Sequence, residues 1–252
     1  MKRAILLTGF NNWGKTHHIR RSSKRMLLQP RVDFMKFIRF ATILLMVSDL
    51  AWGDTIDVLG QKLSFTNPSG YCTLGNSQRE RDLRAMNQSA VGPGSRIVHA
   101  AIRCTELDAF RKGTRDELDH WVQIQLIGSK GDFKRIEMPR EAFLVGVASA
   151  SPRLDAAEIN RRIVTALADT DLSVSKMQLL TLGRDGNAVY FSVRMNLDVG
   201  VSSRPVTGLS GITLVNSLPL TINVYEGTGT AVSREKLQPT LQQLLTSVLT
   251  EN

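Results

Sequence analysis

The alternation of apolar and polar residues predicts the strands of this chain. Residues 188–198, AVYFSVRMNLD, place five apolar side chains on one side and mostly polar side chains on the other, as in an antiparallel strand with one buried face. The Asp185-Gly186 pair ahead of this segment is a turn signal, so residues 173–183 are the expected hairpin partner. Residues 211–227 predict a second pair of strands.

Shorter apolar runs earlier in the chain predict three further strands. Residues 62–72, KLSFTNPSGYC, indicate a strand interrupted by a turn at Pro68-Ser69-Gly70. Residues 96–104, RIVHAAIRC, are nearly all apolar, as expected for a strand covered on both faces, and residues 120–128, HWVQIQLIG, alternate as a strand does. The small residues GLSG at 208–211 are expected to form a turn.

A period near 3.6 residues predicts the helices. Ser77 can cap a helix that runs to about residue 90, and Glu80 can close its capping box. Three more helices are expected at residues 105–112, where Gly113 ends the helix, and at 139–149 and 154–169. One face of a C-terminal amphipathic helix would carry Leu237, Leu241, Leu244, Leu245 and Val248.

Together these elements predict an α+β fold, a mainly antiparallel sheet flanked by helices, because strands occur both singly between helices and as late hairpins. The order resembles the PsbP-like α/β/α sandwich over most of residues 62–250. The resemblance rests on FTNPSGYC at 65–72, the long late hairpins and the C-terminal helix. It implies a module without enzymatic activity, and it assigns no functional residue.

Residues 35–53 predict a signal peptide. Lys36 and Arg39 precede the apolar run 40–47, and Ala51-Trp52-Gly53 places small residues at the two positions that a signal peptidase reads, so cleavage is expected between Gly53 and Asp54. The run is much shorter than the roughly 20 residues that span a bilayer. An uncleaved anchor, giving a single-span inner-membrane protein, is therefore the less favoured alternative. In both cases the basic residues ahead of the run predict that the following residues face outward.

The leader prediction divides the chain into three parts: a basic extension (1–34), the signal peptide (35–53) and a single exported domain (54–252). Translation from Met35 would explain the extension. This division also explains the net charge of +9. Ten of the 32 Lys and Arg but only two of the 23 Asp and Glu lie in residues 1–53. The predicted domain is nearly neutral, which argues against nucleic-acid binding.

The two cysteines, Cys72 and Cys104, both lie in the predicted domain. An even pair in an oxidising compartment is most simply one disulfide, with two buried free thiols as the alternative. Their spacing is unlike the C-x-x-C of thiol-disulfide catalysts. The predicted location is therefore periplasmic or secreted, with the inner membrane as the alternative.

Candidate catalytic chemistry is sparse. His99 lies in the middle of a predicted strand, where a buried structural histidine is expected. If residues 116–120 are helical, Asp116 and His120 share one face of the helix. Together with Glu117 and a serine or a water molecule, they would then form a hydrolase site. The alternative is an ordinary surface turn.

No phosphate-binding loop, nucleophile elbow or metal-ligand motif is present, so we expect no cofactor and no metal. Three arginines on the first helix, Arg79, Arg81 and Arg84, alternate with acids, as on a solvated face. The sequence thus favours an exported, non-enzymatic module that binds a protein or an envelope component. Membrane contact is expected only through an uncleaved leader.

Overall fold

The computed structural model describes residues 53–91, 94–128, 131–151, 157, 161, 164–165, 172–199, 202–227 and 234–252, all within one compact unit, Asp49–Asn252. The basic extension, the predicted signal peptide up to Trp52, and most of the predicted helix 154–169 lie outside the described residues. The elements are β1 (Asp54–Val58), β2 (Gln61–Phe65), β3 (Tyr71–Thr73), α1 (Gln78–Val91), β4 (Ser95–Arg103), α2 (Cys104–Arg111), β5 (His120–Ile127), α3 (Arg140–Ala150), β6 (Leu172–Arg184), β7 (Val189–Val199), β8 (Ser202–Val215), β9 (Leu218–Glu226) and α5 (Arg234–Thr250).

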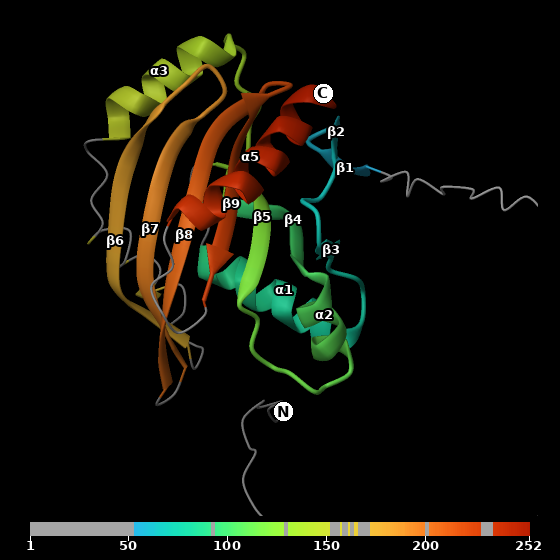
Figure 1. The fold of residues 1–252 in the computed structure, drawn as a ribbon. Helices are drawn as coiled ribbons and strands as arrows, with labels where there is room; N and C mark the ends of the chain where they lie inside the picture. The colour runs from blue at the N-terminus through green and yellow to red at the C-terminus, as the bar shows by residue number, and fades with distance from the viewer. Residues whose placement is uncertain are drawn as a thin grey trace, which may run out of the picture. The chain divides into compact units, whose positions relative to one another are not determined.

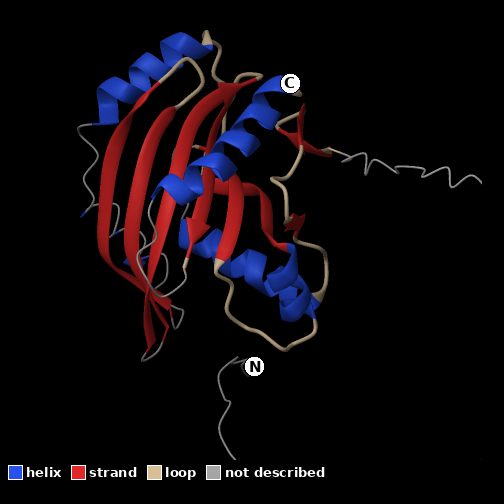
Figure 2. Cartoon of the chain, in the orientation of Figure 1, coloured by secondary structure: helices blue, strands red, loops and turns tan. Residues whose placement is uncertain are grey.

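Seven strands form one antiparallel sheet in the order β3-β4-β5-β9-β8-β7-β6, and β1 and β2 form a separate hairpin (Figure 1; Figure 2). The fold is α+β with helices on the sheet and a C-terminal helix, so the predicted fold class is confirmed. The predicted hairpin between residues 173 and 198 is also confirmed. Asp185 shapes its turn, because its Oδ1 accepts hydrogen bonds from the backbone N–H groups of Asn187 and Ala188. None of the described helices is long and apolar enough to cross a bilayer.

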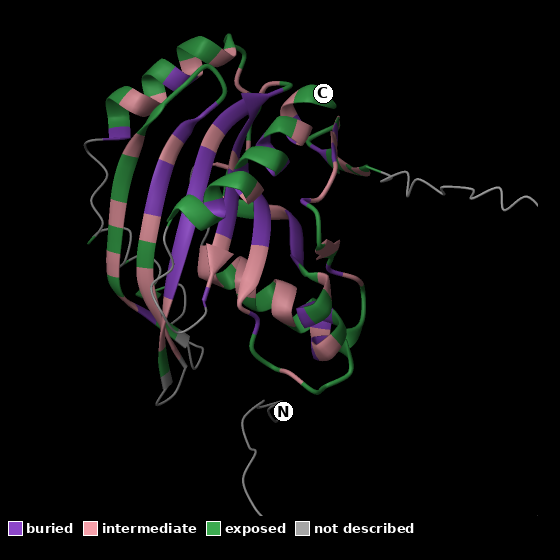
Figure 3. Ribbon diagram, viewed as in Figure 1, coloured by how far each residue is buried: buried purple, intermediate pink, exposed green. Residues whose placement is uncertain are grey.

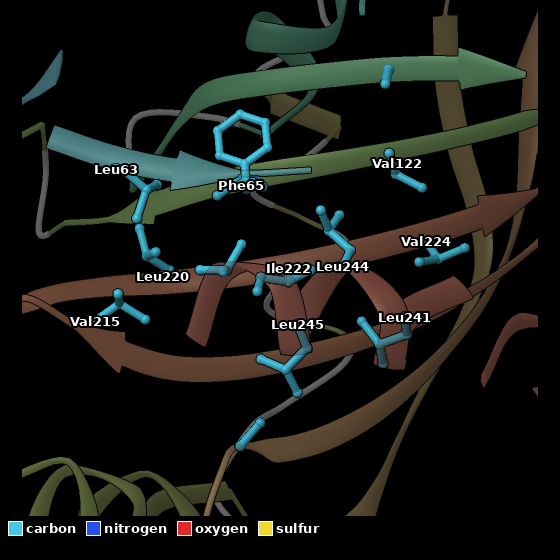
Figure 4. Close-up of a cluster of buried hydrophobic side chains, with 14 of the residues drawn as sticks. Leu63, Phe65, Val122, Val215, Leu220, Ile222, Val224, Leu241, Leu244 and Leu245 are labelled. Carbon is cyan, nitrogen blue, oxygen red and sulfur yellow. The ribbon is translucent and has the colours of Figure 1, made fainter. Parts of the chain in front are cut away.

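Helix α5 packs on the central strands of one face of the sheet, which we call the α5 face. The register of β5 and β9 aligns Val122 with Val224 and Ile124 with Ile222, so their apolar side chains form a continuous surface. The apolar stripe of α5 packs on this surface, as the sequence predicts (Figure 4). The hairpin β1–β2 extends the same core with Val58, Leu63 and Phe65.

The opposite face carries two separate apolar clusters. Helix α2 packs beside β4, and Leu83 of α1 packs against the same cluster. The buried residues of this cluster are Leu74, Ala100, Ile102, Leu107, Phe110 and Leu118. Helix α3 places its buried Leu144 on Val189 and Phe191 of β7. The predicted buried side of β7 is therefore only partly buried, because Val193, Met195 and Leu197 beyond α3 remain half-exposed.

Between these two clusters lies a row of buried polar side chains. Gln123 and Gln125 of β5 are only 4% and 7% exposed, although polar residues that alternate with apolar ones in an antiparallel strand often face solvent. The Gln125 Nε2 group donates to Gln123 Oε1 at 2.8 Å, and the Ser210 hydroxyl donates to Asn223 Oδ1 at 2.6 Å. Both faces of β5 are therefore buried, one among apolar and the other among polar groups.

Residues 208–211 do not form the predicted turn, because they lie in the middle of β8. A Cβ atom on Gly208 would stand 2.7 Å from the ring of Tyr225, which occupies that space and stacks on Trp121 with ring centroids 5.2 Å apart. The small residues here make room for an aromatic side chain on the neighbouring strand.

The two ends of the described unit meet beside β2. Asn252 accepts a hydrogen bond from the Ser64 backbone N–H at 3.0 Å and donates to the Ser64 carbonyl at 2.7 Å. A Cβ atom on Gly53 would lie 2.9 Å from Glu251 Oε2. The start of β1 and the end of α5 are therefore neighbours.

The predicted disulfide is confirmed between Cys72 and Cys104. Cys104 is the first residue of α2 rather than the last residue of the preceding strand. The bond therefore joins the edge strand β3, which has three residues, to the start of α2.

Removing this disulfide should destabilise the domain. In the chain-entropy model, a cross-link between residues 32 apart contributes about 3–4 kcal/mol. We expect the Cys72→Ser/Cys104→Ser variant to unfold at a markedly lower urea concentration than the oxidised protein, with reduced wild-type protein close to the variant. Equal urea midpoints for oxidised and reduced wild-type protein would contradict a stabilising role.

Candidate functional site

The predicted trio of Asp116, Glu117 and His120 is not arranged as a helix face. Residues 115–119 have no helical or strand structure, and His120 begins β5. The Asp116 carboxylate pairs with Arg79. Glu117 is exposed, with its Oε2 atom 3.6 Å from Arg204. The two acids thus bind arginines, and the helical premise of the hydrolase hypothesis is wrong.

His120 instead lies between two other carboxylates. Its Nδ1 atom contacts the carboxylate of Glu106 at the start of α2, and its Nε2 atom is 3.4 Å from Glu226 Oε1 at the end of β9. Glu106 is 5% exposed and also accepts the backbone N–H groups of Asp119 and His120. The side chain of His120 is 16% exposed, so it is not the solvated turn residue of the alternative interpretation either.

A buried carboxylate that orients a histidine is one half of the arrangement that activates a nucleophile. Here the second ring nitrogen faces the carboxylate of Glu226 rather than a hydroxyl or thiol. Among the described residues, no three His, Cys, Asp or Glu side chains are grouped so that they could hold a metal ion. The contacts of His120 therefore favour a structural role that joins α2, β5 and β9.

The three arginines of α1 bond within the domain. Arg79 also lies over the Phe110 ring, 4.5 Å from its centroid, and Arg84 donates to the carbonyls of Leu74 and Gly75. Arg81 bonds to the Asn76 carbonyl and to Gln78. These arginines therefore stabilise the α1 region and do not form a free basic surface.

A groove of about 300 Å³ lies on the α5 face, where the first turn of α5 meets the outer hairpin β6–β7. The described residues that line it are Gln178, Leu180, Ser192, Arg194, Arg234 and Glu235. The register places Gln178 opposite Arg194 and Leu180 opposite Ser192, so two cross-strand pairs form the floor. Leu180 is 60% exposed, the highest value among the large apolar side chains of the described residues.

The groove exists because α5 covers the central strands and not the outer hairpin. Figure 3 shows β6 mostly exposed or half-exposed along its length, whereas buried residues dominate β8 and β9. The sequence indicated that Ser192 and Arg194 lie on the less buried side of β7. It could not reveal the groove, since that depends on where a helix more than 30 residues later begins.

Strand β6 is the last strand of the described sheet beside β7, and it is irregular. Register shifts interrupt its pairing with β7 between Ser175 and Gln178 and between Thr181 and Gly183. Lys176 and Gly183 have positive φ angles of 52° and 120°. Such bulges and a lysine protect an edge from pairing with another strand. The face of the hairpin, rather than its edge, is therefore the candidate surface.

No protein-family model and no curated protein matches this chain. The resemblance to PsbP-like domains accordingly stays a prediction.

His99 is the buried, hydrogen-bonded histidine that the sequence predicts. It is 6% exposed, packs against the Phe65 ring and is 2.8 Å from Asn67 Oδ1 through its Nε2 atom. Its pKa is lowered to about 4, mainly by burial; the nearby Asp54 opposes this effect and Arg84 adds to it. The ring is therefore neutral in the folded protein at neutral pH.

Because of this low pKa, the free energy of unfolding decreases as the pH is lowered. Because the unfolded chain binds a proton near pH 6.5 and the folded chain only near pH 4, stability is lost as the pH drops through that window. The expected loss between pH 7 and pH 5 is about 2 kcal/mol. His99→Gln should show a smaller loss over the same range in urea titrations, and an equal loss in both proteins would contradict the assignment.

Glu80 contributes little to the change in stability between pH 7 and pH 5. Burial alone would raise the pKa of Glu80, but hydrogen bonds from Ser77, the Gly75 amide and Arg111 outweigh it and lower the pKa to about 2. Its stabilising effect is therefore present above the unfolded value of about 4.5 and is lost only below it.

Proposed function

We propose that residues 54–252 form an exported, non-enzymatic module that binds a partner protein or envelope component through the groove between α5 and the β6–β7 hairpin. The observation that carries this proposal is the exposed Leu180 beside Arg194 in a groove that no described helix covers. An exposed apolar side chain within a polar rim is typical of a contact surface.

Export is supported by two observations. The disulfide between Cys72 and Cys104 is of the kind that persists in oxidising compartments. The strand β1 begins at Asp54, directly after the predicted cleavage site. A periplasmic or secreted location explains both, with a single-span protein of the inner membrane as the second candidate.

The mature protein should begin at Asp54. We expect N-terminal sequencing and the intact mass of the exported protein to show loss of the leader, together with two cysteines that resist alkylation until a reductant is added. If Trp52 is retained and the protein stays with membranes after a carbonate wash, the single-span alternative holds instead.

Partner binding can be tested by placing a photo-crosslinking amino acid at Leu180. Val145 of α3, which is 44% exposed and lies outside the groove, is the matched control position. In cells that export the protein, we expect a reproducible adduct with one defined partner from position 180 and not from position 145. Absence of an adduct at position 180, or the same adducts at both positions, would contradict the proposed contact surface.

A further inference from the structure

The groove contains a basic side chain, Arg194, that pairs with no acid among the described residues. Arg194 is exposed and has no ion pair or side-chain hydrogen bond with any residue in the described part of the chain. Most other arginines described above bind carboxylates or carbonyls. For example, Arg204 of β8 is 3.0 Å from the carboxylate of Asp119. Building on the proposed function, we propose that the groove binds a carboxylate side chain of an acidic, extended peptide segment of the partner.

Ser192 adds a hydrogen-bond donor beside Arg194. It is only 9% exposed, lines the groove, and its hydroxyl has no hydrogen-bond partner among the described residues. A serine hydroxyl can donate one hydrogen bond. In the complex, Ser192 can therefore donate to a carboxylate oxygen held by Arg194.

The first turn of α5 adds favourable potential for an anion. Arg234 and Glu235 begin the helix and line the groove, so the positive end of the helix dipole lies beside it. Glu235 opposes this effect and pairs with Arg234, whose Nε atom is 3.2 Å from Glu235 Oε1. The described lining residues, two arginines and one acid, nevertheless carry a net positive charge.

The apolar part of the lining identifies the kind of anion. Leu180 lies on the same face as Ser192 and Arg194, so an acidic side chain bound at Arg194 would have an apolar neighbour. In an extended peptide, residues two apart point to the same side, and a Leu-x-Glu pattern would reach both positions. The volume of about 300 Å³ is roughly that of ten water molecules, which suits two side chains.

A membrane surface fits these features less well. Each basic residue near an anionic bilayer contributes only about 1 kcal/mol, so recognition of a membrane surface needs a cluster of basic residues. The described residues of the groove include two arginines and one opposing acid, which is too few for such a cluster.

The experiment measures binding of a fluorescein-labelled peptide that repeats Ser-Leu-Ser-Glu to the protein with its disulfide intact. We expect saturable binding that weakens at least tenfold in Arg194→Gln, since a hydrogen bond to a charged group is lost. Ser192→Ala should also weaken it. Arg184→Gln is the matched control, because it removes the same charge from an arginine that binds Glu141 of α3 outside the groove.

A peptide that repeats Ser-Leu-Ser-Gln and phosphatidylglycerol vesicles distinguish the alternatives. Equal affinity for the Glu and Gln peptides, or an unchanged affinity in Arg194→Gln, would overturn carboxylate recognition. Arg194-dependent binding to vesicles without peptide binding would overturn it in favour of a lipid. A crosslinked partner at position 180 that Arg194→Gln still captures would leave the proposed function standing and remove only this inference.

Discussion

The structure depends on the packing of α5 across the central strands. Its five leucine and valine side chains form the core of the α5 face together with β5, β8, β9 and the hairpin β1–β2. A helix of 17 residues is about 25 Å long, and α5 contacts mainly β2, β8 and β9. The β6–β7 hairpin continues the sheet beyond β8, and the groove lies where the first turn of α5 meets this hairpin.

The two faces of the sheet are stabilised by different interactions. The α5 face is held by apolar contacts, which are favourable in proportion to buried area and tolerate some rearrangement. The opposite face combines two apolar clusters with the polar row of Gln123, Gln125, Ser210 and Asn223, in which the Asn223 Nδ2 group has no hydrogen-bond partner. Because strand side chains alternate with a period of two, a slip of β5 by one residue would bring its glutamines into the α5 core. The polar row therefore helps to define the register.

Local patterns in the sequence predicted most of the described elements. The capping box of Ser77 and Glu80, the Asp185-Gly186 turn and the apolar stripe of α5 each depend on residues a few positions apart, and each was correctly interpreted. Features that depend on distant residues were missed. Glu106 as the partner of His120, the space beneath Tyr225 that requires Gly208, and the groove at the start of α5 all join segments that only the folded chain brings together.

The contact between the two ends of the unit has a topological consequence. Asn252 is hydrogen-bonded to β2 and Gly53 lies against Glu251, so a short linker could join the ends without distorting either element. The order of the strands along the chain is then partly independent of the fold, and a circularly permuted chain opened at an exposed turn such as Gly186 should reach the same sheet. The same closeness means that a bulky fusion at either end would lie beside the β1–β2 hairpin rather than over the groove.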